Sequence, residues 1–285
     1  MFYKHYFEKN ITVNLCYLTR KIQKISSFSR FACQFFVLCV SSNINELCRD
    51  GILDKISFSM EKGEMTAIMG PSGSGKSTLL YNIAGMDCPT GGSVLLDGRE
   101  ITSLSEDERA DMRLRETGFV FQQMNMLKGL NILDNILLPA VYANKGKNGR
   151  TRAELAERAD MLMKKLSVSD IAQRRIWQVS GGQLQRACIC RSMMNDPKII
   201  FADEPTGALN KSASAEVMAE LSRLSREGTA ILTVTHDSRA ASCCDRVLYL
   251  SDGRICGEIL LGKPENGAEK EREDELNRQL AEMGW

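Results

Sequence analysis

The sequence predicts an α/β fold with a mostly parallel core sheet, an antiparallel β edge and an all-helical insert. Short apolar segments typical of buried strands alternate with helical patterns over residues 65–85 and again over 198–259. Such alternation favours βαβ units, whose parallel sheets are covered by helices on both faces. The pattern changes to helical over residues 123–178, which indicates an all-helical insert within the α/β chain.

Composition narrows the class of protein. The chain has 285 residues, 43% of them hydrophobic, which is enough for a substantial core. Its 37 Lys and Arg residues balance 36 Asp and Glu residues, so no basic excess favours nucleic acid as a partner. The ten cysteines include no C-x-x-C pair, and two histidines are too few for the usual zinc site. We therefore expect free thiols and a cytoplasmic location.

Residues 1–48 do not follow the α/β pattern. Basic residues precede the apolar run Phe31–Val40, as in a signal peptide, but no convincing cleavage site follows. The run also falls short of the roughly 20 residues that a membrane-spanning helix needs. We expect an atypical N-terminal extension that is membrane-facing, poorly ordered, or altered by a wrong start or a reading-frame error.

From residue 49 the elements follow in a regular order, and we expect one domain over 49–262. Ser105–Glu108 has the form of a capping box and opens a charged helix through Arg115, while Asp97-Gly98 is a strong hairpin signal. The other helix expected in this part runs from Lys76 to Gly85. The expected strands are residues 52–60, which alternate like an exposed edge strand, 65–69, 93–96 and 118–121.

The helical insert and the return of the α/β pattern complete the domain. Within the insert we expect a helix over 131–143 interrupted by Pro139, a loop over 144–149, and a helix opened by the capping box Thr151–Glu154. A charged tail, 263–285, carries apolar residues at helical spacing and predicts an amphipathic helix. The remaining expected elements are strands at 198–203, 230–235, 246–250 and 254–259 and a helix over 212–227.

One stretch carries the clearest chemistry. Residues 70–77 fit G-x-x-x-x-G-K-[ST] and lie between a strand and a helix start. Glycines let the backbone curl around an anion, so that N–H groups and the helix dipole point at phosphate oxygens. Lys76 then reaches the β- and γ-phosphates of a nucleoside triphosphate, and Ser77 is placed to bind Mg²⁺. The predicted nucleotide-binding residues here are Gly70, Pro71, Ser72, Gly73, Ser74, Gly75, Lys76, Ser77 and Thr78.

Two further motifs decide what the triphosphate is used for. Residues 199–204 form an apolar strand ending in Asp203, which can hold Mg²⁺, and Glu204, which can reach a water aligned on the γ-phosphate. Residues Ser180, Gly181, Gly182 and Gln183 directly open a helix and make a second anion site.

Taken together, these motifs resemble the ABC-transporter ATPase family over roughly residues 52–260. The matching positions, in the family's order, are Gly70–Thr78, Gln122, Ser180–Gln183, Asp203-Glu204-Pro205, Gly207-Ala208-Leu209-Asn210 and His236. Residues 121–125, 204–207 and 283–285 look most like the ATPase subunits paired with macrolide, lipoprotein-release and antimicrobial-peptide permeases.

The resemblance implies an ABC ATPase fold and a head-to-tail dimer, with each ATP between the phosphate loop of one copy and Ser180–Gly182 of the other. It also implies that Gln122 binds Mg²⁺ or the attacking water, and that His236 contacts the γ-phosphate and holds Glu204 in line. The family usually stacks an aromatic residue on adenine. No aromatic residue lies near Asn43, and Phe35 and Phe36 are the nearest candidates.

Several functions remain open at this stage. An ATPase subunit on the inner face of the cell membrane, driving a separate permease, fits the motifs best, since no apolar segment of about 20 residues could form a transport path. ATPases of this type that act on DNA or ribosomes normally have tandem units or long coiled coils, which this sequence lacks. Kinases and GTPases share only the phosphate loop. A catalytically impaired ATP-gated module is the last alternative.

Overall fold

The computed structural model describes residues 36–41, 52–144, 150–265 and 267–285, with backbone only for 36–41. The strands are β1 (Phe36–Ser41), β2 (Phe58–Glu61), β3 (Met65–Met69), β4 (Ser93–Leu96), β5 (Arg99–Glu100), β6 (Thr117–Phe121), β7 (Ile199–Asp203), β8 (Ala230–Val234), β9 (Arg246–Ser251) and β10 (Arg254–Leu260). The helices are α3 (Lys76–Ile83), α4 (Glu106–Glu116), α5 (Ile132–Ala143), α6 (Arg152–Lys165), α7 (Gly181–Met193), α8 (Lys211–Arg226), α9 (Ser238–Ser242) and α10 (Glu269–Glu282).

The core sheet has six strands in the order β10-β9-β3-β8-β7-β6. All neighbouring pairs are parallel except β10 with β9, which confirms the mostly parallel sheet. The carboxyl ends of parallel strands meet at one edge, where open α/β sheets bind their ligands. The phosphate loop follows β3, Glu204 follows β7, and His236 comes two residues after β8. The topology therefore gathers these predicted site residues at one edge.

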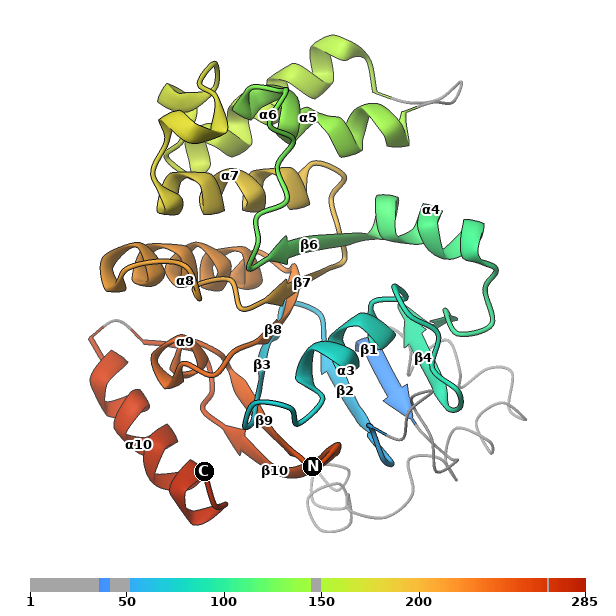
Figure 1. Cartoon of the computed structure of the whole chain (residues 1–285), viewed down its shortest axis with the longest axis vertical. Coiled ribbons are helices and arrows are strands. Elements are labelled where there is room, and N and C mark those ends of the chain that lie inside the picture. Colours follow the sequence, from blue (N-terminus) through green and yellow to red (C-terminus); the bar gives the residue numbers. More distant parts are fainter. Residues whose placement is uncertain (1–35, 42–51, 145–149, 266) are drawn as a thin grey trace, which may run out of the picture.

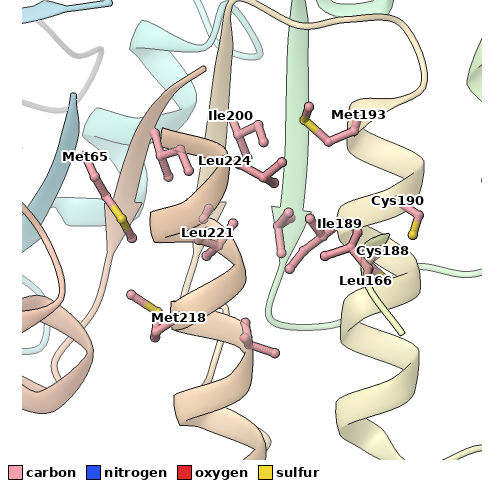
Figure 2. Packing of buried hydrophobic residues seen from close by; sticks show 14 of the residues in the cluster. Met65, Leu166, Cys188, Ile189, Cys190, Met193, Ile200, Met218, Leu221 and Leu224 are labelled. Carbon is pink, nitrogen blue, oxygen red and sulfur yellow. The ribbon is translucent and has the colours of Figure 1, made fainter. Parts of the chain in front are cut away.

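Both faces of the sheet are covered. Successive residues of β7 alternate between two buried clusters: Ile200 belongs to a first cluster with α7 and α8, and Phe201 to a second cluster with α3 and the antiparallel strands. Figure 2 shows Ile200 within the first cluster together with Leu221 and Leu224 of α8. Burial on both faces explains why β3, β7 and β8 are mostly apolar along their length, with Thr66, Asp203 and Thr233 as the polar exceptions.

A separate antiparallel sheet has the order β2-β1-β4-β5. The turn joining β4 and β5 has Asp97 and Gly98 at φ 49° and 78°, as the hairpin signal predicts. The strand expected over 52–60 is too long, because only 58–61 pair. Residues 52–57 cross the β9–β10 turn instead, where the Asp54 N–H donates to the Gly253 carbonyl oxygen (2.8 Å) and Leu53 and Ile56 are buried.

Strand β1 differs from the expectation that residues before 49 lie outside the ATPase fold. It pairs antiparallel with β2 on one side and β4 on the other, so it lies inside the sheet. Its sequence FVLCVS is rich in aromatic and β-branched residues, which favour strands. Residues 1–35 and 42–48 of the expected extension lie outside the described residues.

The helical segment follows β6. Within it, helix α6 begins with the predicted capping box Thr151–Glu154. Helix α4, which precedes β6, also begins with its predicted capping box, Ser105–Glu108. Helix α5 is not interrupted and runs through Pro139. Its packing on α6 and α7 offsets the hydrogen bond that a proline cannot donate. Figure 1 shows α5, α6 and α7 together, on the other side of α8 and β6 from α3.

Helix α10 confirms the amphipathic tail. Leu276 and Leu280 are fully buried, and the Arg272 guanidinium donates to the carbonyl oxygens of Ser242, Cys244, Leu261 and Gly262 at 2.7–3.0 Å. No helix in the described part of the chain combines the length and apolar character needed to cross a membrane. The cysteines whose side chains are described are free thiols.

Candidate nucleotide-binding site

The phosphate loop forms a backbone cradle between β3 and α3. Gly73 and Gly75 have φ of 83° and 97°, in the left-handed region that favours glycine. A Cβ at Gly70 would lie 2.0 Å from the Leu250 carbonyl oxygen, so the loop passes too close to β9 for any side chain there. The sequence therefore needs its glycines at these positions to form this curve.

Lys76 points back into the loop. Its Nζ donates to the carbonyl oxygens of Gly70 and Pro71, both at 2.8 Å. Burial lowers the pKa of Lys76, and the nearby carboxylates of Glu204 and Asp203 oppose that shift. A partly desolvated ammonium group whose present partners are two carbonyl oxygens is suited to bind an anion, because negatively charged oxygens are stronger acceptors than carbonyl groups.

Asp203 joins the end of β7 to α3. The Ser77 hydroxyl lies 3.1 Å from Asp203 Oδ1, and the Tyr81 hydroxyl donates to Oδ2 at 2.7 Å. This hydrogen bond, together with burial, raises the pKa of Tyr81 to about 12, so the phenol stays protonated as a donor. The carboxylate is thus held on both oxygens by one face of one helix.

Glu204 and His236 form a pair beside this carboxylate. His236 Nδ1 lies 2.7 Å from Glu204 Oε1. The Glu204 side chain is 15% exposed and the His236 side chain 68% exposed, so the pair opens to solvent on its histidine side. Glu204 has φ 47°, a conformation that is strained for a residue other than glycine and is common at functional sites. Its N–H donates to the Val234 carbonyl oxygen at 2.9 Å, which fixes the turn to β8.

Gln122 reaches the same edge from β6. It is exposed, and a Cβ added at Gly207 would lie 2.9 Å from its Nε2 atom. Gly207 follows Glu204 in a tight turn, with its N–H donating to the Glu204 carbonyl oxygen at 3.1 Å. The structure therefore brings Gln122, Glu204 and His236 together at the carboxyl edge of the sheet, beside Lys76, Ser77 and Asp203.

The second predicted anion site lies elsewhere. Ser180 is the exposed N-cap of α7: the Gln183 N–H donates to Ser180 Oγ (3.3 Å), and the Ser180 N–H donates to Gln183 Oε1 (3.0 Å). Gly182 packs against α8, where an added Cβ would meet Ala213 at 2.9 Å. Figure 1 shows α7 beyond α8 and β6 from α3, so one chain does not bring its two anion sites together.

The donor set fits Mg²⁺ held jointly with phosphate. Ser77 and Asp203 offer hard oxygen atoms, while the described residues contain no group of three or more His, Cys, Asp or Glu side chains that could hold a metal alone. Mg²⁺ is commonly bound by one or two protein oxygens together with substrate phosphates and waters. The site therefore suits an ion that arrives with a nucleotide.

Two residues of the site need separate comment. The predictions missed Tyr81, although its spacing of four from Ser77 places both on one helix face. Asn210 caps α8 by accepting from the Ala213 N–H at 3.0 Å, so its amide has a structural role.

The candidates for stacking on adenine, Phe35 and the side chain of Phe36, lie outside the described residues.

Comparison with known proteins agrees with this geometry. A family model described as ABC transporter matches residues 53–207, more than half of the chain. The chain belongs to the ABC transporter family. The match includes the phosphate loop, Ser180–Gln183 and the Asp203-Glu204 pair, and the chain is accordingly an ABC transporter ATPase.

Relatives and solved structures of the ABC transporter family share most of the fold. The chain is 44% identical over 207 residues to macrolide export ATP-binding/permease protein MacB of Aggregatibacter actinomycetemcomitans, covering 73% of this chain but 31% of MacB. It is 42% identical over 204 residues to the ABC transporter ATP-binding protein YknY of Bacillus subtilis, covering 72% of this chain and 86% of YknY. The dimeric ATP-binding cassette MJ0796, bound to ADP and Pi after hydrolysis, matches with a TM-score of 0.70 at 35% identity over 79% of this chain and 98% of that chain.

Proposed function

We propose that two copies of this chain hydrolyse ATP as a head-to-tail dimer. The observation that carries the proposal is the separation of the two anion sites: the phosphate loop and the Ser180 end of α7 lie on different parts of one molecule. A triphosphate needs both only if a second copy supplies the missing half. The dimeric state of the MJ0796 cassette supports this arrangement.

In this proposal the predicted residues divide the work of binding and hydrolysis. Lys76 neutralises the β- and γ-phosphates, together with the backbone N–H groups of the loop other than Pro71. Glu204 accepts a proton as water attacks the γ-phosphorus, forming a new P–O bond while the bond to the bridging oxygen of ADP breaks. His236, 2.7 Å from Glu204, orients that carboxylate and contacts the γ-phosphate. The partner copy adds Ser180, Gly181, Gly182 and Gln183.

Ser77, Asp203 and Gln122 are the residues that would hold Mg²⁺. When bound, the ion would neutralise charge on the phosphate oxygens during transfer. Gln122 directly follows the last residue of β6 and precedes α5, so it lies between the core sheet and the helical insert along the chain. A change at the nucleotide can therefore be transmitted to the insert through this residue.

The partner we propose is a separate membrane permease, with this chain at the inner face of the cell membrane. MacB is named as an ATP-binding/permease protein, and this chain spans about a third of its length. Export or removal of antimicrobial peptides, lipophilic drugs or lipoproteins is the proposed use. A function on DNA or ribosomes has no supporting feature in the described residues, whose helices include no long coiled coil.

A charge at Ser180 tests the shared site. Ser180→Asp keeps an N-capping side chain but places a negative charge where the partner's γ-phosphate is expected. We expect Ser180→Asp to bind ATP with wild-type affinity and to lose at least about 90% of its hydrolysis, because charge repulsion of this kind costs several kcal/mol. Ser180→Asn, a neutral cap of the same shape, is the control and should retain most activity. Equal ATPase rates for the two variants would refute a shared site.

A further inference from the structure

Helix α3 presents two hydroxyl groups to a single carboxylate. Ser77 and Tyr81 are four residues apart, which places them on one face of the helix, toward β7. Ser77 Oγ lies 3.1 Å from Asp203 Oδ1, and the Tyr81 hydroxyl lies 2.7 Å from Oδ2. The shorter contact is the one to the tyrosine. The two oxygens of Asp203 thus have different partners.

The Tyr81 ring is held in place from several directions. It is half-buried and packs against the second cluster, which also contains Leu79, Leu80 and Ile83 of α3. The backbone of Tyr81 is held as well: its carbonyl oxygen accepts from the N–H groups of Met86 (2.9 Å) and Asp87 (3.2 Å), which fixes the end of the helix from which the ring projects. A ring anchored in this way presents its hydroxyl at a defined position rather than sampling solvent.

The hydrogen bond decides which way Asp203 points. An ionised carboxylate accepts on both oxygens and can rotate unless both are held. Asp203 and the positively charged Lys76 attract each other electrostatically. A carboxylate released from Tyr81 could therefore turn toward Lys76 instead. With Oδ2 held by the phenol, Oδ1 stays beside Ser77, where both oxygens can serve one cation.

We propose that Tyr81 is a positioning residue for Mg²⁺: by holding Oδ2 of Asp203, it keeps Oδ1 and the Ser77 hydroxyl directed at the ion that accompanies ATP. The inference rests on the proposed function, since it assumes that Asp203 and Ser77 hold the ion. Hydrogen-bonding partners of metal-binding carboxylates commonly change metal affinity by about 10- to 100-fold when removed. In this role Tyr81 acts on the ion only through Asp203.

The test is Tyr81→Phe, which removes only the hydroxyl and keeps the ring in the second cluster. Binding of the non-hydrolysable analogue AMP-PNP to the full chain is measured by calorimetry across a Mg²⁺ series and in EDTA. We expect unchanged affinity in EDTA and an approximately tenfold rise in the Mg²⁺ concentration for half-maximal enhancement. ATPase activity should recover toward the wild-type rate at high Mg²⁺. Tyr142→Phe, in α5 far from the site, is the matched control and should leave the Mg²⁺ series unchanged.

A second variant and two opposing outcomes complete the design. Tyr81→Leu fills the same apolar cluster without a donor and should show the same Mg²⁺ shift, whereas loss of packing alone would lower affinity in EDTA as well. A Mg²⁺ series of Tyr81→Phe identical to that of the wild type overturns the inference and leaves the proposed function standing. A wild-type chain that binds AMP-PNP without any Mg²⁺ dependence overturns the proposed metal site, and the inference with it.

Discussion

Replacing Glu204 by glutamine is expected to lower ATP turnover by about a hundredfold or more, the usual contribution of a general base. Glutamine keeps the size of the side chain and its capacity to accept from His236, but it cannot take up a proton. Affinity for ATP should stay near that of the wild type, because the proposed phosphate contacts come from the loop and Lys76 and not from Glu204. Phosphate release and nucleotide titration measure the two quantities separately.

Glu271→Gln, on an exposed part of α10, is the matched control for Glu204→Gln and should hydrolyse ATP at the wild-type rate. Glu204 would be removed from the mechanism if its glutamine variant retained wild-type turnover. Loss of ATP binding in the same variant would instead assign Glu204 to affinity, in conflict with its hydrogen bond to His236 rather than to the loop.

Lys76→Ala should lower the affinity for ATP by at least about 10- to 100-fold, the range for a lost charge-assisted hydrogen bond. The ammonium is already partly desolvated and contacts two loop carbonyl oxygens, so its removal takes a positive charge directly from the loop. Calorimetric titration with ATP gives the answer directly. Lys270→Ala, on the surface of α10, is the control. Unchanged affinity in Lys76→Ala would mean that this loop is not the phosphate site.

Much of the site can be predicted from sequence because its signals are local. The glycines of the phosphate loop, the apolar strand before Asp203 and the capping residues each depend on a few neighbouring positions. Parallel topology then places strand ends together without further information. This is why Lys76, Asp203, Glu204 and His236 lie together at the sheet edge as expected. It is also why α4 and α6 begin at their capping boxes.

Other features depend on contacts between distant segments. Residues 52–57 alternate like a strand, but the β9–β10 turn takes the Asp54 N–H that would have paired with a neighbouring strand. The composition of β1 favours a strand, but only its pairing with β2 and β4 on both sides places it inside the sheet. Tyr81 resembles any half-buried helical residue until β7 places Asp203 beside its hydroxyl. In all three cases contacts with distant segments determine the structure, and the spacing of residues in the sequence does not reveal those contacts.

The central claim is that two copies complete each other's ATP site. The most direct measurement is the mass of the particle in solution, by light scattering, for Glu204→Gln with Mg-ATP, because blocked hydrolysis should hold the closed state. We predict a mass of two chains with ATP and one chain without it, and a single-chain mass for Glu204→Gln combined with Ser180→Asp under the same conditions. A dimer that forms equally well with aspartate at Ser180, or a Glu204→Gln chain that stays monomeric with saturating Mg-ATP, would contradict the account.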